Sequence, residues 1–212
     1  METPPIRVLL GDDHRIVREG LKLVLADAPD IAVVAEAASG PEVLQQVATT
    51  PPDVVLLDIA LPGLDGLEVL QALRRERPGI AVLMLSTYPE NQYAARCIKL
   101  GAAGYLNKST DPDDLIAAVR KAAAGGIYVN AAAGEALAHA LGGARARQGL
   151  DALSHREHQV YRLLVSGHSV SQIGAQLGLA ANTVSTYRAR VLEKTGTRND
   201  VELTLFAERH AR

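Results

Sequence analysis

The segment from Asp53 to Gly63, DVVLLDIALPG, constrains this chain most, because four consecutive apolar residues in it end at an acid. Prolines stand on both sides of the run. A short, β-branched apolar run bounded in this way is typical of a strand buried on both faces, as in a parallel sheet. Such a strand would place Asp58 at the ligand-binding edge of the sheet, as a nucleophile, a metal ligand or a helix cap. The turn residues that follow Asp58 make the cap the weakest of the three.

Apolar runs alternate with segments of helical spacing through the first 125 residues. The expected strands are 6–10, 31–37, 54–58, 80–85 and 104–107. The expected helices are 16–26, one beginning near Ser39, 64–77, 91–100, and one capped by residues 110–112 that ends near 124. Five strand–helix units of this kind predict an α/β domain with a parallel, doubly wound sheet and helices on both faces.

Polar residues follow four of the expected strands. Asp12 and Asp13 follow the first, Asp58 the third, Ser86 the fourth and Lys108 the fifth. Parallel strands deliver their carboxyl ends to one edge, so these side chains are expected to lie close together. Three carboxylates suit Mg²⁺, and a carboxylate can also accept a phosphoryl group covalently. The metal and Lys108 would offset phosphoryl charge, while the Ser86 hydroxyl would donate to a phosphoryl oxygen.

Length and charge favour two domains. The chain has 212 residues, which is comfortable for two small domains. Its net charge of −2 hides an asymmetry: residues 1–125 hold 17 acids and 12 bases, while residues 126–212 hold 7 acids and 10 bases. An acidic first part and a basic second part suggest two different partners, with a nucleic acid as the candidate for the second.

The compartment is expected to be the cytoplasm. No apolar run approaches the roughly 18 residues that a membrane span needs, and the N-terminus lacks the pattern of a secretory signal. The single cysteine, Cys97, excludes an intramolecular disulfide and a cysteine zinc site. We therefore expect no association with a membrane.

Residues 127–149 form the expected linker. An alanine-rich part from Ala131 to Leu141 is compatible with a short helix. The glycine-rich, basic part from Gly142 to Gly149 lacks apolar periodicity and is expected to be a flexible tether.

The last part of the chain predicts four helices. Ser154 with Glu157, and Ser169 with Gln172, fit the capping-box pattern at two helix starts. Asn182 is the expected cap of a third helix that ends near Thr195, and a fourth covers about 200–208. A helix, a short glycine turn and a second helix predict a helix-turn-helix, whose second helix enters the major groove.

The third of these helices has two faces. Val184, Tyr187 and Val191 make the expected inward stripe. Arg188 lies near the flank. The outward face is expected to hold Asn182, Ser185, Thr186, Ala189, Arg190 and Glu193.

Residues 5–125 resemble a bacterial response-regulator receiver domain, a five-stranded parallel, flavodoxin-like fold. The matching pieces are Asp12-Asp13-His14, the LDIALPGLDG segment at 57–66, Ser86 and the GAAGYLNK segment at 101–108. The resemblance implies that a sensor histidine kinase transfers a phosphoryl group to Asp58. It also implies Mg²⁺ held by Asp13, Asp58 and the backbone carbonyl of Ala60, with Asp12 acting largely through water. Ser86 and Tyr105 match the family's switch pair, in which the hydroxyl follows the phosphate and the ring turns inward.

Residues 150–207 resemble the LuxR-type DNA-binding domain of the NarL/FixJ class. The matching pieces are LSHRE at 153–157, IGAQL at 173–177 and NTVSTYRAR at 182–190. The resemblance implies that bases are read mainly at Ser185, Thr186 and Ala189. Relatives often carry lysine at the first and last of these, so phosphate contacts are expected from the arginines. The full set of expected DNA contacts is Asn182, Thr183, Ser185, Thr186, Arg188, Ala189, Arg190 and Lys194.

The two resemblances predict a receiver domain at 1–126, a linker at 127–149 and an all-α, four-helix DNA-binding domain at 150–212. We expect a two-component transcriptional regulator whose phosphorylation drives it to form a homodimer on promoter DNA. The last helix resembles the family's dimerisation helix, with Val201 and Leu205 as candidate contacts. The only expected chemistry is autocatalytic phosphotransfer and dephosphorylation at Asp58.

Two rival functions remain open at this point. A regulator of the same architecture would bind DNA without phosphorylation. A Mg²⁺-dependent phosphatase would use the same sheet edge, although the basic C-terminal part argues against it.

Overall fold

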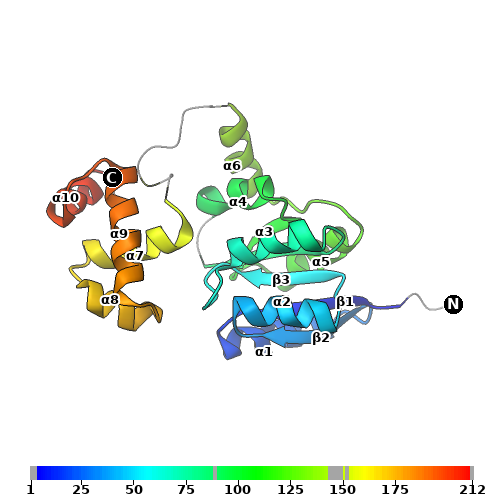
Figure 1. Cartoon of the computed structure of the whole chain (residues 1–212). Coiled ribbons are helices and arrows are strands. Elements are labelled where there is room, and N and C mark those ends of the chain that lie inside the picture. The colour runs from blue at the N-terminus through cyan, green and yellow to red at the C-terminus, as the bar shows by residue number, and fades with distance from the viewer. Residues whose placement is uncertain (1–3, 88–89, 143–149, 151–152, 211–212) are drawn as a thin grey trace. The chain divides into compact units, whose positions relative to one another are not determined.

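A computed structural model of the chain describes residues 4–87, 90–142, 150 and 153–210 (Figure 1). The chain forms two compact units, Met1–Ala144 and Arg145–Arg212. Each unit has a hydrophobic core of its own. Within the described ranges, no helix is both long and apolar enough to cross a membrane.

The first unit contains a five-stranded sheet whose strands are all parallel. The strand order is β2-β1-β3-β4-β5, which is the flavodoxin-like order. All five residues of the central strand β3 are buried, because helices cover both faces of the sheet. The five predicted strands are confirmed as β1 (Ile6–Gly11), β2 (Ile31–Ala37), β3 (Val54–Asp58), β4 (Ala81–Ser86) and β5 (Gly104–Asn107).

Five helices follow these strands and form two layers. Side chains of α2, α3 and α4 pack into a core on one face of the sheet, and those of α1 and α5 into a core on the other. This arrangement confirms the predicted doubly wound α/β domain. The helices are α1 (Arg15–Ala26), α2 (Gly40–Thr49), α3 (Gly66–Glu76), α4 (Glu90–Lys99) and α5 (Pro112–Ala123).

Local hydrogen bonds explain where the helices begin. Ser39 caps α2 by accepting from the Glu42 amide, as predicted. Helix α3 begins at Gly66, two residues later than the predicted start at Leu64. The reason is a capping box: the Asp65 carboxylate accepts from the Glu68 amide at 2.8 Å, and the Glu68 carboxylate accepts from the Asp65 amide at 2.9 Å.

Helix α1 departs from a simple amphipathic pattern. Ile16 and Leu23 recur at helical spacing with the core residues, yet their exposed fractions are 87% and 74%. Leu25 alone among the helix residues is fully inside. The apolar pattern therefore predicts the helix but not which of its apolar side chains are buried.

The first part of the expected linker belongs to the first unit. Helix α6 (Ala131–Gly142) packs against α4, and Ala133 is buried in the core on that side of the sheet. Just before it, Tyr128 forms a parallel bridge to Gly104 of β5, with its amide donating to the Ala103 carbonyl at 2.7 Å. Residues 143–149, where the flexible tether was expected, lie outside the described part of the chain.

Tyr105 and Cys97 are two fully buried side chains of the first unit. Tyr105 on β5 is fully buried in the core beneath α4. Cys97 on α4 is also fully buried, and burial raises the pKa of its thiol to about 12.

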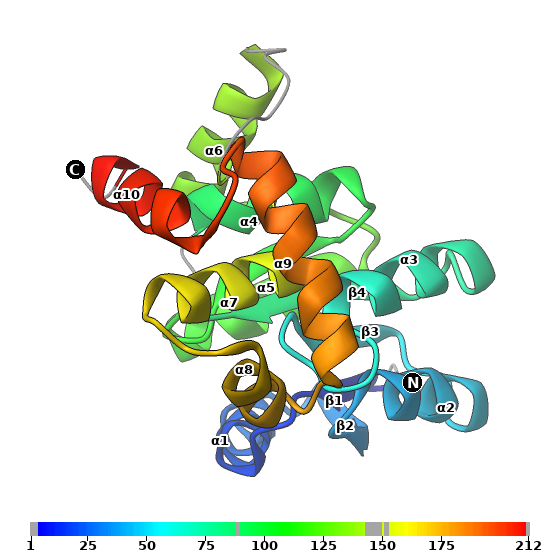
Figure 2. The same ribbon diagram turned by 60° about the vertical axis from the view of Figure 1, so that its left-hand side comes forward.

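The second unit is a bundle of four helices, as predicted. Both predicted capping boxes are present, Ser154 with Glu157 and Ser169 with Gln172. Figure 2 shows α9 crossing α7, with α8 near the first turn of α9. The helices are α7 (His155–Val165), α8 (Val170–Leu177), α9 (Ala181–Thr195) and α10 (Asp200–His210).

The predicted cap of α9 is wrong. Helix α9 begins at Ala181, so Asn182 lies in its first turn and Ala180 occupies the cap position without a side-chain hydrogen bond. The turn before it is fixed by the backbone instead. Gly178 adopts a left-handed conformation (φ 65°), and the Leu179 amide donates to the Gly174 carbonyl at 2.9 Å. This turn ends α8, and α9 begins three residues after Gly178.

Candidate functional site

The carboxyl ends of β1 and β3 bring two acids from distant parts of the chain together. Asp12 follows β1, Asp58 ends β3, and these strands are neighbours at the point where the strand order reverses. Their exposed fractions are only 1% and 3%. Ligand atoms of Asp12, Asp13, His14 and Asp58 lie within 4.8 Å of one another. We call these four residues the acid pocket.

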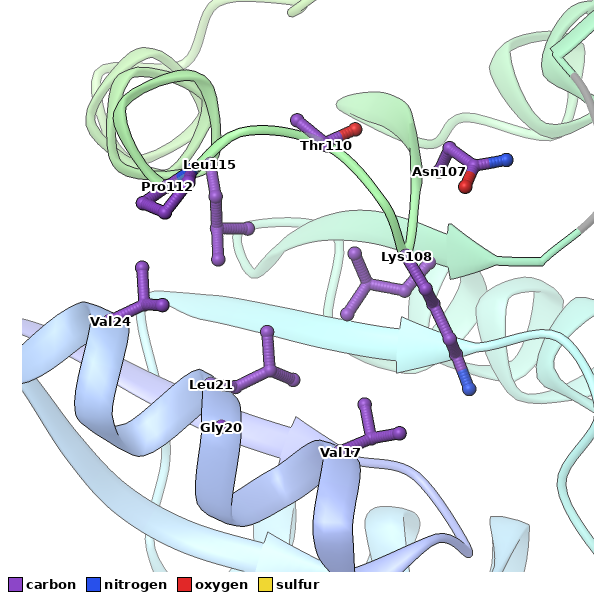
Figure 3. A pocket seen from close by; sticks show the side chains of 10 residues that line it. Val17, Gly20, Leu21, Val24, Asn107, Lys108, Thr110, Pro112 and Leu115 are labelled. Atoms are coloured by element: carbon purple, nitrogen blue, oxygen red, sulfur yellow. The ribbon is translucent and has the colours of Figure 1, made fainter.

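Lys108 reaches the acid pocket from the loop after β5. Its Nζ lies 2.6 Å from Asp12 Oδ2 and 3.0 Å from Asp58 Oδ2. Its aliphatic stem lines an apolar groove of about 260 Å³ between α1 and α5, whose walls include Leu21 and Leu115. Figure 3 shows the extended Lys108 side chain beside the apolar side chains that line the groove. A lysine can pack its methylene groups along an apolar surface while its amine contacts charged partners, here the Asp12 and Asp58 carboxylates.

The electrostatics of the pocket follow from this geometry. Burial raises the pKa of Asp58 above its ordinary value, while Lys108 opposes that rise and Asp12 adds to it. For Lys108, burial acts to lower the pKa, but the Asp58 and Asp12 carboxylates outweigh it and the pKa is raised. The lysine is therefore held in its charged form between two acids.

The backbone around Asp58 is held by a close helix approach. A Cβ at Gly66 would come 2.1 Å from the Asp58 carbonyl oxygen, so only glycine allows α3 to begin here. The Gly66 amide donates to the Ile59 carbonyl at 2.9 Å, and the Ile59 amide donates to Leu85 on β4 at 3.2 Å. A backbone hydrogen bond from Ala60 also reaches the Asp58 carboxylate.

The donor set of the pocket fits a hard divalent cation. Asp12, Asp13 and Asp58 supply carboxylate oxygens within one ligand sphere, and Mg²⁺ is bound in proteins mainly through one or two carboxylates and water. The Asp13 side chain is 35% exposed, which leaves room for water ligands. The pocket is therefore able to hold a metal.

The predicted switch residues lie on the same edge and beneath it. Ser86 ends β4 with an exposed fraction of 1%, and its carbonyl accepts from the Lys108 amide at 2.8 Å. Tyr105 is paired across β4 and β5 with Met84, two residues before Ser86 in β4. The structure thus brings Ser86 to the strand ends that carry Asp58 and Lys108, and places Tyr105 within the core.

Two residues of this region were missed by sequence reasoning. His14 Nδ1 lies 2.7 Å from an Asp13 oxygen. Arg18 donates from Nη1 to the Asp12 carbonyl at 2.6 Å and from Nε to Glu36 at 3.0 Å. The spacing of His14 and Arg18, one helical turn apart at the start of a helix, was the available signal.

The second candidate site is the exposed face of α9. Asn182, Thr183, Ser185, Thr186, Ala189 and Arg190 are all exposed. Val184 and Val191 are fully buried and Tyr187 is half-buried, which confirms the predicted inward stripe. The Ser185 and Thr186 hydroxyls each donate to the carbonyl four residues earlier at 3.0 Å, so their oxygens remain available as acceptors.

The basic side chains of α9 differ in what they touch. Arg188 Nε lies 2.8 Å and 3.1 Å from the two Asp200 oxygens at the start of α10. Lys194 Nζ lies 2.6 Å from Glu157 Oε2 on α7, and Glu157 is 2% exposed. Arg190 is exposed. The structure thus separates the predicted cationic contacts into two that are paired within the unit and one that faces solvent.

Helix α10 presents an apolar outer face. Val201 and Leu205 have exposed fractions of 72% and 52%, whereas Leu203 between them is fully buried against the core of the unit. The predicted dimerisation residues are therefore accessible to a partner.

Comparison with known families matches both units. Residues 8–120 match the response regulator receiver domain, and residues 151–207 match the bacterial regulatory proteins of the luxR family. The first match alone spans more than half of the chain.

Similar proteins extend the match over nearly the whole chain. The chain is 35% identical over 206 residues to the response regulator UvrY of Escherichia coli K12, covering 97% of this chain and 94% of that one. It is 38% identical over 205 residues to the response regulator GacA of Pseudomonas protegens, covering 97% and 96%. Among solved structures, the response regulator ChrA of a heme-sensing two-component system is 33% identical, covers 99% of each chain and gives a TM-score of 0.54.

Proposed function

The chain belongs to the two-component response regulators that join a receiver domain to a LuxR-type DNA-binding domain, and we propose that Asp58 is its phosphoacceptor. The proposed donor is the phosphohistidine of a sensor histidine kinase. The output is transcriptional regulation through the second unit, in the cytoplasm. The chain turns over no outside substrate in this proposal.

The observation that carries the proposal is the contact of Lys108 with two buried carboxylates. A buried acid beside a fixed cation at the ligand-binding edge of a parallel sheet is arranged to receive a negatively charged group. A purely structural acid would not need a lysine from a different strand end and two further acids within the same ligand sphere.

The transfer step follows from these side chains. An Asp58 carboxylate oxygen attacks phosphorus, an O–P bond forms, and the N–P bond of the phosphohistidine breaks with its electron pair going to the imidazole nitrogen. Lys108 offsets charge on the phosphoryl oxygens and the Ser86 hydroxyl donates to one of them. Mg²⁺, when held by Asp13, Asp58 and the Ala60 carbonyl with Asp12 acting through water, supplies further charge compensation.

The output step is proposed to be pairing of two copies on DNA. Val201 and Leu205 on α10 supply exposed apolar surface for a second copy. The exposed face of α9 would lie in the major groove, and a dimer would contact two half-sites about 10 bp apart. Phosphorylation shifts the chain toward this paired form.

The test combines intact mass and light scattering on the full chain. Treatment with acetyl phosphate and Mg²⁺ should add one phosphoryl group to the wild type and none to Asp58→Ala. Beryllium fluoride with Mg²⁺ should convert the wild type from monomer to dimer and leave Asp58→Ala monomeric. Asp113→Asn, which removes an exposed acid of α5, should behave as the wild type.

The outcomes separate the proposal from its rival. A phosphoryl group on Asp58→Ala would show that the acceptor is another residue. Equal DNA affinity of wild type and Asp58→Ala after the same treatment would instead support a regulator that binds DNA without phosphorylation.

A further inference from the structure

The pair formed by Arg188 and Asp200 joins the DNA-facing helix to the helix with the exposed apolar face. Arg188 belongs to α9 and Asp200 is the first residue of α10. The Nε of Arg188 lies within hydrogen-bond distance of both Asp200 carboxylate oxygens, at 2.8 Å and 3.1 Å. We propose that this pair is a positioning contact that sets the spacing of the two DNA half-sites, a role that rests on the function proposed above.

The helical face of Arg188 argues against a direct contact with DNA. It lies four residues after Val184 and three before Val191, which are both fully buried, so it shares their side of α9. The exposed face around Thr186, Ala189 and Arg190 points elsewhere. Arg188 is directed toward α10, where its guanidinium pairs with the Asp200 carboxylate.

The start of α10 is fixed at three points. Asn199 accepts from the Glu202 amide at 2.9 Å, and the Glu202 carboxylate accepts from the Arg198 amide at 2.9 Å, which closes a reciprocal cap. Leu203 is buried in the core. That core also contains Val184 and Val191 of α9, and the Arg188 contact adds a charged link between a side chain of α9 and the first residue of α10.

The exposed residues of α10 lie directly beside this contact. Val201 follows Asp200 in the chain, and Leu205 lies one turn further on the same side. If two copies pair through these residues, the angle between α10 and α9 fixes how far apart the two α9 helices lie. Releasing Arg188 from Asp200 would loosen that angle while leaving each α9 face unchanged.

The pair is suited to positioning more than to stability. Side chains of Arg188 and Asp200 are 35% and 43% exposed, and such half-exposed ion pairs stabilise a fold only weakly. Asp200 also lies at a helix N-terminus, where an acid is favoured whether or not an arginine is present. Loss of the pair should therefore leave the unit folded.

The experiment measures preference for spacing with the beryllium fluoride form of the full chain. The probe is a DNA duplex selected by the wild type from a random library, together with versions whose half-sites are moved by about 2 bp and a version with one half-site. Asp200→Asn should reduce the ratio of affinities between selected and altered spacings by at least about threefold, while single-half-site affinity and melting temperature change little. The charge-reversed double variant, Arg188→Asp with Asp200→Arg, should restore the ratio.

Arg190→Gln serves as the matched control. Removal of an exposed cation should weaken binding to every spacing alike and reduce the salt slope by about 1, with the spacing ratio unchanged. If Asp200→Asn instead raises affinity for all spacings equally, Arg188 is a DNA contact held back by Asp200 and the positioning role is wrong. An unchanged ratio in Asp200→Asn would also overturn it.

Failure of the proposed function would give a different result from failure of the positioning role. A wild type that selects no paired half-sites would overturn the proposed dimeric DNA binding, and the positioning role with it, before any variant is compared.

Discussion

The acid pocket of the first unit and the exposed face of α9 in the second unit hold polar groups in opposite ways. In the pocket, Asp12, Asp58 and Lys108 come from three strand ends and are buried against one another. On α9, the polar side chains lie on a single helix and face water. The first site is made by the topology of the sheet, and the second by the surface of one element.

This difference predicts different responses to substitution. Buried charges act at short range in a poorly polarisable environment, so each one changes the chemistry strongly. Exposed charges are screened by salt and contribute little until a partner displaces water and counterions. We expect large effects from single changes in the pocket and graded, salt-dependent effects from α9.

Lys108→Ala should give the largest effect. Without the amine, phosphoryl transfer from acetyl phosphate should slow by about 10²–10³-fold, since a charge that stabilises the transition state is lost. Because Lys108 opposes the rise in the pKa of Asp58 that burial causes, its loss raises that pKa further and moves the rate profile to higher pH. Rapid-mixing kinetics across pH measures both, and Lys121→Ala, an exposed lysine of α5, should match the wild type.

Gly66→Ala tests whether the pocket depends on the helix approach behind it. The new methyl group would meet the Asp58 carbonyl, so the free energy of unfolding should fall by about 1–3 kcal/mol. Hydrogen exchange of the β3 amides reports this value. Gly20→Ala, whose new methyl group would meet nothing within 4 Å at an exposed position of α1, should instead raise stability by up to about 1 kcal/mol. Equal effects of the two changes would contradict the argument.

Glu157→Gln tests a buried charge in the second unit. Burial acts to raise the pKa of Glu157, but Lys194 and Ser154 outweigh it and hold the pKa below its ordinary value of 4.5. The stability this group contributes is therefore present above pH 4.5 and is lost as pH falls through the lower pKa of the folded state. At neutral pH the variant should lose about 1–2 kcal/mol, measured from hydrogen exchange of α9, and its stability should vary less with acid.

Ser185→Lys should give the smallest effect and the one most sensitive to salt. A lysine on the exposed face of α9 should steepen the salt dependence of DNA binding by about 0.9 in the double-logarithmic slope. Titration of a DNA duplex at several salt concentrations measures the slope. Ser166→Lys adds the same charge at the end of α7 and should change the slope less. Similar slopes for both variants would mean that net charge, and not the face of α9, governs binding.

Much of the first unit was predictable because its signals are local. Buried strands between turn residues, and acids at their ends, specify the sheet and therefore the neighbourhood of Asp58. The capping boxes at Ser154 and Ser169 likewise specified where two helices of the second unit begin. In each case a short stretch of chain contains the whole reason for the structure.

The features that escaped prediction depend on distant contacts. Ile16 and Leu23 have the spacing of core residues, and only the packing of α1 leaves them outside. Lys194 was predicted as a DNA contact, and its ion pair with Glu157, 37 residues away, was not predicted. Asn182 was expected to cap α9, but the helix begins at Ala181, soon after the turn at Gly178 that ends α8. An alanine-rich stretch likewise does not reveal that α6 packs on α4.

The buried thiol of Cys97 makes the chain convenient for labelling. It is the single cysteine of the sequence, it is fully enclosed, and a thiol with a pKa of about 12 offers almost no thiolate at neutral pH. Two introduced cysteines, one on the surface of each unit, would therefore be the groups that react with a maleimide dye or spin label. Distances between the two units, before and after phosphorylation, can then be measured without first removing a native residue.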